Sequence, residues 1–138
     1  MIENVFVDTN ILVYSYSLDD PEKFERSRKL LRIDLDECDI FISTQIINEF
    51  YATMSRRRVP HDSIKQIINE LYKCTQIRTL TFQIIEFALE LKEKYLYSWW
   101  DSLVLSSALE SNCSVLYSED MQHKQIIENS LEIINPFI

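Results

Sequence analysis

Four carboxylates in this chain combine residue types and positions that suit metal-ion chemistry. Asp8 and Asp120 each follow a short apolar run typical of a buried strand, and Glu49 lies near the start of a helix that follows another such run. Asp101 lies in the first turn of a helix that is apolar nearly all round. Because the carboxyl ends of parallel strands share one edge of a sheet, these scattered side chains can converge on one crevice.

Clustered carboxylates repel one another, and each raises the pKa of its neighbours. Mg²⁺ or Mn²⁺, which are hard cations that prefer oxygen ligands, would relieve that repulsion. A cation held in this way activates a water molecule and stabilises the charge that develops on a phosphodiester. The four acids therefore predict metal-assisted hydrolysis of phosphodiester bonds.

The first two acids also have a purely structural interpretation. Asp8 could end its strand and cap the next helix, and Thr9 and Asn10 are capping residue types as well, so both are interpreted first as caps. Glu49 borders the apolar stripe of its helix and could be an ordinary solvated glutamate.

The other two acids are equally open to a structural role. Asp101 follows Ser98 by three residues, which is the spacing of a capping box. Asp120 could be an acid favoured at the positive end of a helix dipole. No single position decides between structure and chemistry, so the prediction rests on the four acids together.

Composition excludes several other kinds of site. The 138 residues contain no glycine, which rules out Walker loops, dinucleotide fingerprints and the glycine-flanked nucleophile elbow. The net charge of −8 argues against loose electrostatic binding of nucleic acid, although an acidic cation site would contribute to the same imbalance.

The cellular setting is predicted from cysteine use and hydropathy. The three cysteines are widely spaced and form no CxxC motif, so neither a disulfide framework nor a structural zinc site is expected. No apolar run approaches the roughly 20 residues that cross a membrane. We therefore expect a cytoplasmic protein without a membrane segment.

Alternating elements must position the four acids. Predicted strands cover residues 5–7, 39–42, 76–80, 114–117 and 131–134. Helical spacing of apolar residues predicts helices between them and a short helix over residues 119–129, whereas the acidic residues 34–39 are interpreted as a turn. No linker or repeat divides the chain, so residues 1–138 are predicted to form one α/β domain with a largely parallel sheet.

Single residues predict where several of these helices begin and end. Asp20 precedes a proline and is a predicted N-cap, and Thr81 and Ser98 are predicted to cap later helices. Pro60 is predicted to open a helix, and Asn112 takes the place of the glycine that commonly ends one.

On these residues the chain resembles a PIN domain, specifically the short VapC-type toxins of bacterial and archaeal toxin–antitoxin modules. The resemblance covers essentially the whole length and is carried by four motifs in order: VFVDTNILVY, INEFY, SWWDSLVLSSALE and VLYSEDMQH. It implies a three-layer α/β/α sandwich with a central, mostly parallel sheet. It also implies that each motif contributes one acid: Asp8, Glu49, Asp101 and Asp120.

The resemblance further implies an activity and partners. The activity is that of a metal-dependent endoribonuclease, in which Mg²⁺ or Mn²⁺ is held by these four acids and water is the nucleophile. Thr9, Asn10 and Ser118 would be supporting residues beside the acids. The expected partners are an RNA substrate, a second copy of the chain in a homodimer, and a small antitoxin whose C-terminal segment occupies the toxin surface.

Arg56, Arg57 and Arg58 form the basic cluster that is best suited to an RNA backbone. The same residues are also explained as a solvated helix end, since cations are favourable at the negative end of the helix dipole. Both interpretations stay open from the sequence.

Two alternatives to a nuclease follow from the same residues. A catalytically weak protein with this fold could use its groove mainly to hold a partner, but a binding surface does not require carboxylates that repel one another. An aspartyl-nucleophile phosphatase would need a second aspartate two residues after Asp8, and Asn10 occupies that position.

Overall fold

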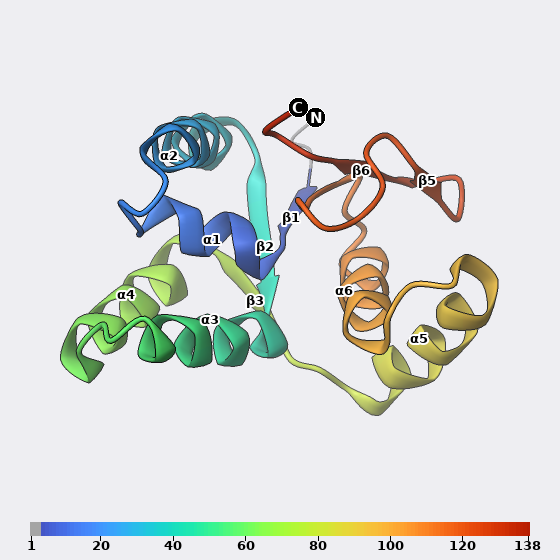
Figure 1. Ribbon diagram of the computed structural model, residues 1–138. Helices are drawn as coiled ribbons and strands as arrows, with labels where there is room; N and C mark the ends of the chain where they lie inside the picture. Colours follow the sequence, from blue (N-terminus) through green and yellow to red (C-terminus); the bar gives the residue numbers. More distant parts are fainter. Residues whose placement is uncertain (1–3) are drawn as a thin grey trace.

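The computed structural model describes the backbone of residues 4–138 and the side chains of residues 4–32, 34 and 38–138 (Figure 1). The strands are β1 (Asn4–Val7), β2 (Asp39–Ser43), β3 (Gln76–Arg78), β4 (Val115–Tyr117), β5 (Ile126–Ile127) and β6 (Leu131–Ile134). The helices are α1 (Thr9–Ser15), α2 (Pro21–Glu37), α3 (Thr44–Arg56), α4 (His61–Cys74), α5 (Phe82–Tyr95) and α6 (Trp99–Glu110).

The strands of this described region form one sheet in the order β3-β2-β1-β4-β6-β5. All neighbours pair in parallel except β5 and β6, which pair antiparallel. Helices α1 to α4 lie on one side of the sheet and α5 and α6 lie on the other (Figure 1). The predicted three-layer α/β/α sandwich with a mostly parallel sheet is therefore confirmed.

The core forms where the helices cover the central strands. Val5, Phe6 and Val7 of β1 are all buried, which is expected of a parallel strand with helices on both faces. Phe50 of α3 and Leu105 of α6 are completely buried and belong to the same apolar cluster. Burial of these side chains supplies the main driving force for the arrangement that fixes the site.

Most predicted helix boundaries agree with the structure. The Thr81 hydroxyl accepts a hydrogen bond from the backbone of Ile84 at 3.2 Å, and the Ser98 hydroxyl accepts one from the backbone of Asp101 at 3.1 Å. The Asp20 carboxylate caps α2 by accepting a hydrogen bond from the backbone of Lys23. Pro60 is the N-cap residue of α4, and Asn112 has a φ of 55°, the left-handed conformation expected of it.

Three local predictions are wrong. Residues 119–129 do not form a helix: the segment turns through positive φ at Lys124, Glu128 and Asn129 and pairs β5 with β6. Residues 34–39 do not form a turn, because α2 continues through Glu37 in a stretch that contains no helix-breaking residue. Thr9 and Asn10 are the first residues of α1 rather than its caps.

Left-handed backbone is adopted without glycine. The positive-φ residues of the described chain are Arg58, Leu96, Asn112, Lys124, Glu128 and Asn129. Leu96, with a φ of 64°, ends α5 in the position that glycine most often takes, and its side chain is 83% exposed. No helix within residues 4–138 has the length and hydropathy needed to cross a membrane.

Candidate active site

The order of the strands locates a crevice at the carboxyl end of β1. From β1 the chain adds β2 and then β3 on one side, and after β3 it crosses over to place β4 on the other side of β1. Ligands bind open parallel sheets at this kind of switch point, outside the carboxyl ends of the two strands. Asp8 follows β1 directly, and Ser118 follows β4.

An open pocket of about 240 Å³ lies at this switch point. Its lining includes all four predicted acids, Asp8, Glu49, Asp101 and Asp120. The remaining lining residues come from α1 and from α3 with its C-cap: Thr9, Asn10, Val13, Tyr14, Thr53 and Arg57. A larger pocket of about 320 Å³ between α1, α2 and α4 is mostly apolar and contains none of the four acids, so size does not mark the polar site.

Asp8 is both the N-cap of α1 and the most deeply buried acid of the pocket, with 6% of its surface exposed. Its Oδ1 accepts a hydrogen bond from the backbone of Thr9 at 2.8 Å, and its Oδ2 accepts one from the Ser118 hydroxyl at 2.8 Å. Burial raises the pKa of Asp8 to about 7, against the opposing effect of these two hydrogen bonds, and the nearby charges of Asp101 and Glu49 add to the increase.

Glu49 is held by two donors, Gln45 one turn earlier on α3 and Thr9 on α1. Its Oε1 accepts from Gln45 Nε2 at 3.0 Å and lies 3.5 Å from the Thr9 hydroxyl. Burial raises the pKa of Glu49, the two hydrogen bonds lower it, and the charge of Asp101 raises it further. Burial likewise raises the pKa of Asp101, where Ser98 opposes the effect and the charge of Asp120 adds to it.

Asp120 is tied to α1 through Asn10. The Asn10 amide nitrogen donates to Asp120 Oδ2 at 2.9 Å, and the Asn10 side-chain oxygen accepts from the backbone of Glu119 at 3.3 Å. The Asp120 backbone in turn donates to the Ser118 hydroxyl at 3.3 Å. Each of the predicted supporting residues, Thr9, Asn10 and Ser118, thus contacts one of the four acids directly.

Sequence reasoning missed Gln45, which connects two of the acidic motifs. Gln45 is 7% exposed, and besides Glu49 its Nε2 donates to the backbone oxygen of Trp100 at 3.2 Å, immediately before Asp101. The signal was available, because Gln45 and Glu49 are separated by one helical turn, the spacing at which side chains interact along a helix.

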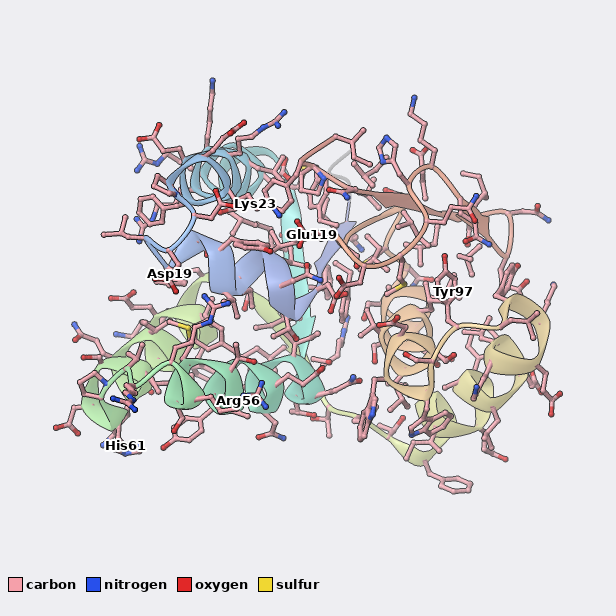
Figure 2. The ribbon with its side chains drawn as sticks, viewed as in Figure 1. Asp19, Lys23, Arg56, His61, Tyr97 and Glu119 are labelled. Carbon is pink, nitrogen blue, oxygen red and sulfur yellow. The ribbon has the colours of Figure 1, made fainter. Side chains whose placement is uncertain are left out.

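Sequence reasoning also missed a cluster that anchors the loop after β4. Tyr14 donates to Glu119 Oε1 at 2.7 Å, and Lys23 of α2 forms an ion pair with Oε2 of the same carboxylate. Lys23 and Glu119 face one another between α2 and the loop that follows β4 (Figure 2). This cluster fixes the loop immediately before Asp120.

The three arginines after Ser55 differ in position. Arg57 lines the acid pocket and donates through Nη1 to Ser17 at 3.2 Å and Asp19 at 3.3 Å. Arg56 donates instead to Thr53 at 3.3 Å, and Arg58 is one of the left-handed residues.

The acids suit a hard divalent cation in chemical type. As they stand, no three His, Cys, Asp or Glu side chains of the described region are grouped closely enough to hold a metal ion. The four acids nevertheless offer only oxygen donors, and burial and mutual repulsion raise the pKa of three of them. A cation would offset both effects, and oxygen donors are the ligand type that Mg²⁺ and Mn²⁺ prefer.

Comparison with known proteins gives a matching family and a set of similar structures that includes the three named below. The family model described as PIN domain matches residues 5–129. The chain is 17% identical to Mycobacterium tuberculosis VapC20, described as a Sarcin-Ricin loop cleaving toxin, with a TM-score of 0.69 over 84% of this chain and 89% of that one. No curated protein matches the chain.

Two further structures are complexes. One is VapBC2 from Rickettsia felis bound to a DNA fragment from their promoter, at 17% identity and a TM-score of 0.70 over 96% of this chain and 99% of that one. The other is a toxin–antitoxin complex from Klebsiella pneumoniae, at 16% identity and a TM-score of 0.71 over 96% and 97%. At these identities the likeness is one of fold.

Proposed function

The chain belongs to the PIN domain family, and from this premise we propose that it is a metal-dependent endoribonuclease, the toxin of a VapBC-type toxin–antitoxin pair. The observation that carries the proposal is that Asp8, Glu49, Asp101 and Asp120, from four separate segments, line one pocket at the switch point of the sheet. The similar fold of a toxin that cleaves the sarcin–ricin loop supports RNA as the class of substrate.

In the proposed reaction, Asp8 and Asp101 would be the central ligands of Mg²⁺ or Mn²⁺ and Asp120 would be a further ligand. Glu49 would serve either as a ligand or as the base that orients the water. A divalent cation bound there supplies an activated water and stabilises negative charge on the phosphodiester. In the role of base, Glu49, whose pKa is raised by burial, would orient the attacking water and accept its proton at a carboxylate oxygen. Asn10 and Ser118 keep Asp120 and Asp8 in place through the hydrogen bonds described above.

The products distinguish this route from metal-free cleavage of RNA. Attack by water on phosphorus breaks the bond to the 3′ oxygen, which leaves a 5′-phosphate on one fragment and a 3′-hydroxyl on the other. Attack by the neighbouring 2′-hydroxyl would instead leave a cyclic phosphate. End analysis of the cleaved RNA therefore tests the proposed nucleophile.

The proposed partners follow from the comparisons. Two of the similar structures are complexes of toxins with antitoxins, which supports a small antitoxin as the partner of this chain. We further propose that the chain is a single domain over residues 1–138, forms a homodimer and acts in the cytoplasm.

A second candidate function is a partner-binding protein with weak or no catalysis. It is favoured by the net charge of −8 and by the separation of the acids, no three of which within residues 4–138 are grouped closely enough for a metal ion as they stand. It predicts that metal ions do not stabilise the protein and that exchange of Asp8 has no effect on activity.

Thermal unfolding against Mn²⁺ concentration separates the two candidates. Wild type should gain stability as Mn²⁺ rises, because a ligand that binds only the folded state raises the unfolding midpoint. The double variant Asp8→Asn/Asp101→Asn should not respond. The control Asp39→Asn/Asp62→Asn removes the same charge from two exposed acids outside the pocket and should respond like wild type.

A response shared by wild type and the pocket variant would reject the metal site and leave the binding protein as the leading candidate. If the response is confined to proteins with an intact pocket, cleavage of structured RNAs is measured next with the same three proteins. Loss of cleavage in the pocket variant alone is the expected result.

A further inference from the structure

The acid pocket extends along the groove between α1 and α3. Glu49, Thr53 and Arg57 line it at intervals of four residues, so they follow one face of α3 into its C-cap. At a rise of about 1.5 Å per residue, Arg57 lies roughly 12 Å along the helix axis from Glu49. Residues of α1, from Thr9 to Tyr14, form the facing wall.

Arg57 is the only lysine or arginine among the described residues that line this pocket. A substrate with several phosphates approaches a protein of net charge −8 against electrostatic repulsion, so a cation in the groove would offset it locally. The planar guanidinium suits this task, because its donors match the oxygens of a phosphate.

In the free protein the Arg57 guanidinium is engaged by oxygens of the turn between α1 and α2. Its Nη1 donates to Ser17 Oγ at 3.2 Å and to Asp19 Oδ2 at 3.3 Å. The side chains of Arg57 and Asp19 are 39% and 80% exposed. Asp19 lies at this turn, on the side of α1 that faces α3, the helix that carries Arg56 (Figure 2).

Exposed ion pairs contribute little to stability, so exchanging Asp19 for another anion costs little free energy. The Asp19 carboxylate and Ser17 hydroxyl both accept from one guanidinium nitrogen, Nη1, whereas a phosphate group can accept from two guanidinium nitrogens in parallel. The contacts with Ser17 and Asp19 therefore bind the Arg57 guanidinium only weakly.

We propose that Arg57 binds an RNA phosphate that flanks the cleaved bond, and that Asp19 is an intramolecular competitor for the same guanidinium. The inference rests on the proposed function in taking RNA as the ligand. It adds a specific phosphate-binding residue and a reason why binding is restrained in the free protein. Because Arg57 lies about two helical turns along α3 from Glu49, the proposal assigns it to RNA affinity rather than to the chemical step.

Opposite effects of two charge-removing substitutions test the proposal. The probe is a fluorescein-labelled RNA hairpin, whose binding is followed by fluorescence anisotropy in EDTA so that no metal-dependent cleavage occurs. Arg57→Ala should weaken binding by on the order of tenfold and reduce the slope of log affinity against log salt by roughly one phosphate contact. Asp19→Asn should tighten binding several-fold, because the competitor loses its charge.

The matched control is Lys65→Ala, which removes one positive charge from an exposed position on α4 outside the pocket. The inference is overturned if Lys65→Ala weakens binding as much as Arg57→Ala, or if Asp19→Asn does not tighten it. Should Arg57→Ala fail to fold, Asp19→Asn alone decides, since it leaves α3 and its C-cap unchanged.

Addition of Mn²⁺ to the same samples separates this inference from the proposed function. If Arg57→Ala weakens RNA binding and Asp19→Asn tightens it, but no RNA is cleaved, the phosphate site stands and the nuclease proposal is rejected. If the protein cleaves RNA but the substitutions of Arg57 and Asp19 leave RNA affinity unchanged, the nuclease proposal stands and the phosphate site is rejected.

Discussion

The Ser118 hydroxyl donates a hydrogen bond to Asp8 Oδ2 at 2.8 Å and joins residues that are 110 positions apart in the chain. The contact crosses the switch point between β1 and β4, which the two residues directly follow. It is also the largest of the interactions that oppose the increase in the pKa of Asp8 caused by burial. One hydroxyl thus links the fold of the sheet to the charge state of the pocket.

Exchange of Asp8 for asparagine should stabilise the metal-free protein at alkaline pH. The pKa of Asp8 rises from 3.8 in the unfolded chain to about 7 in the folded protein, so folding takes up a proton between these values. The free energy of unfolding of wild type therefore falls as pH rises through this window. Asp8→Asn avoids the buried charge and should be more stable than wild type at pH 8 by on the order of 1–4 kcal/mol.

Urea unfolding in EDTA at pH 5 and pH 8 measures this effect. The advantage of Asp8→Asn should be small at pH 5, where the Asp8 carboxyl of folded wild type is protonated. Asp39→Asn, an exchange at an exposed aspartate on β2, provides the control and should follow wild type at both pH values. An equal advantage for Asp8→Asn at the two pH values would contradict the assigned pKa.

Removal of the Ser118 hydroxyl should weaken metal binding near neutral pH. Without its hydrogen bond the pKa of Asp8 rises further, so less of the carboxylate is ionised at pH 7. We expect Ser118→Ala to bind Mn²⁺ roughly tenfold more weakly at pH 7 and to approach wild type at pH 9. Calorimetric titration at both pH values makes the comparison.

Ser106→Ala is the matched control for that titration. The Ser106 hydroxyl is also completely buried and donates to the backbone oxygen of Ile84 at 2.7 Å, and Ser106 does not line the acid pocket. It should lose comparable stability without changing how Mn²⁺ affinity depends on pH. If both variants change that dependence alike, the effect of Ser118 is a general loss of stability.

Gln45 should affect turnover more than substrate binding. Gln45→Met keeps the length of the side chain but removes the donor that holds Glu49 and the Trp100 backbone oxygen. We expect kcat for RNA cleavage to fall about tenfold with KM little changed, since one hydrogen bond to a charged group is lost. Gln66→Met, at an exposed position on α4, should behave like wild type. A fall in stability with unchanged kcat would assign Gln45 to the fold alone.

The ion pair between Lys23 and Glu119 should affect the proposed metal site, whereas the ion pair between Lys94 and Glu128 should not. Lys23→Met releases the loop that leads to Asp120, so we expect the Mn²⁺ affinity to fall several-fold and the Tm to fall by a few degrees. Lys94 lies near the end of α5 and pairs with Glu128. Lys94→Met breaks this ion pair and should leave Mn²⁺ affinity unchanged. Equal Mn²⁺ affinities in the two variants would show that the Lys23 cluster does not support the pocket.

The sequence predicts those parts of the fold that depend on local patterns. The apolar run at Val5–Val7 lies on a buried strand, and Thr81 and Ser98 cap the helices that they were expected to cap. Such residues act on their immediate neighbours, so the local structure that they form can be predicted without the rest of the chain. The convergence of Asp8 and Asp120 is also predictable, since both come shortly after parallel strands of one sheet, whereas Asp101 lies in the first turn of α6 and reaches the pocket only through the packing of that helix.

Local sequence patterns do not predict structure that depends on contacts with residues far away in the chain. Asp8, Thr9 and Asn10 are all capping types, and only the register of β1 against β4 determines that Asp8 is the cap. Residues 126–127 carry apolar side chains that suit a helix or a strand equally well, and pairing with β6 decides for the strand. The contact of Asn10 with Asp120 likewise depends on the closure of the whole sheet.

The left-handed turn at Leu96 has a practical consequence for protein engineering. Introducing glycine normally destabilises a protein, but in this chain glycine at position 96 would relieve the steric conflict of a side chain that is 83% exposed and ends a helix at φ 64°. Glycine's greater freedom in the unfolded chain offsets part of that gain. A chain that contains no glycine thus offers a simple route to thermostabilisation at Leu96, which does not line the acid pocket.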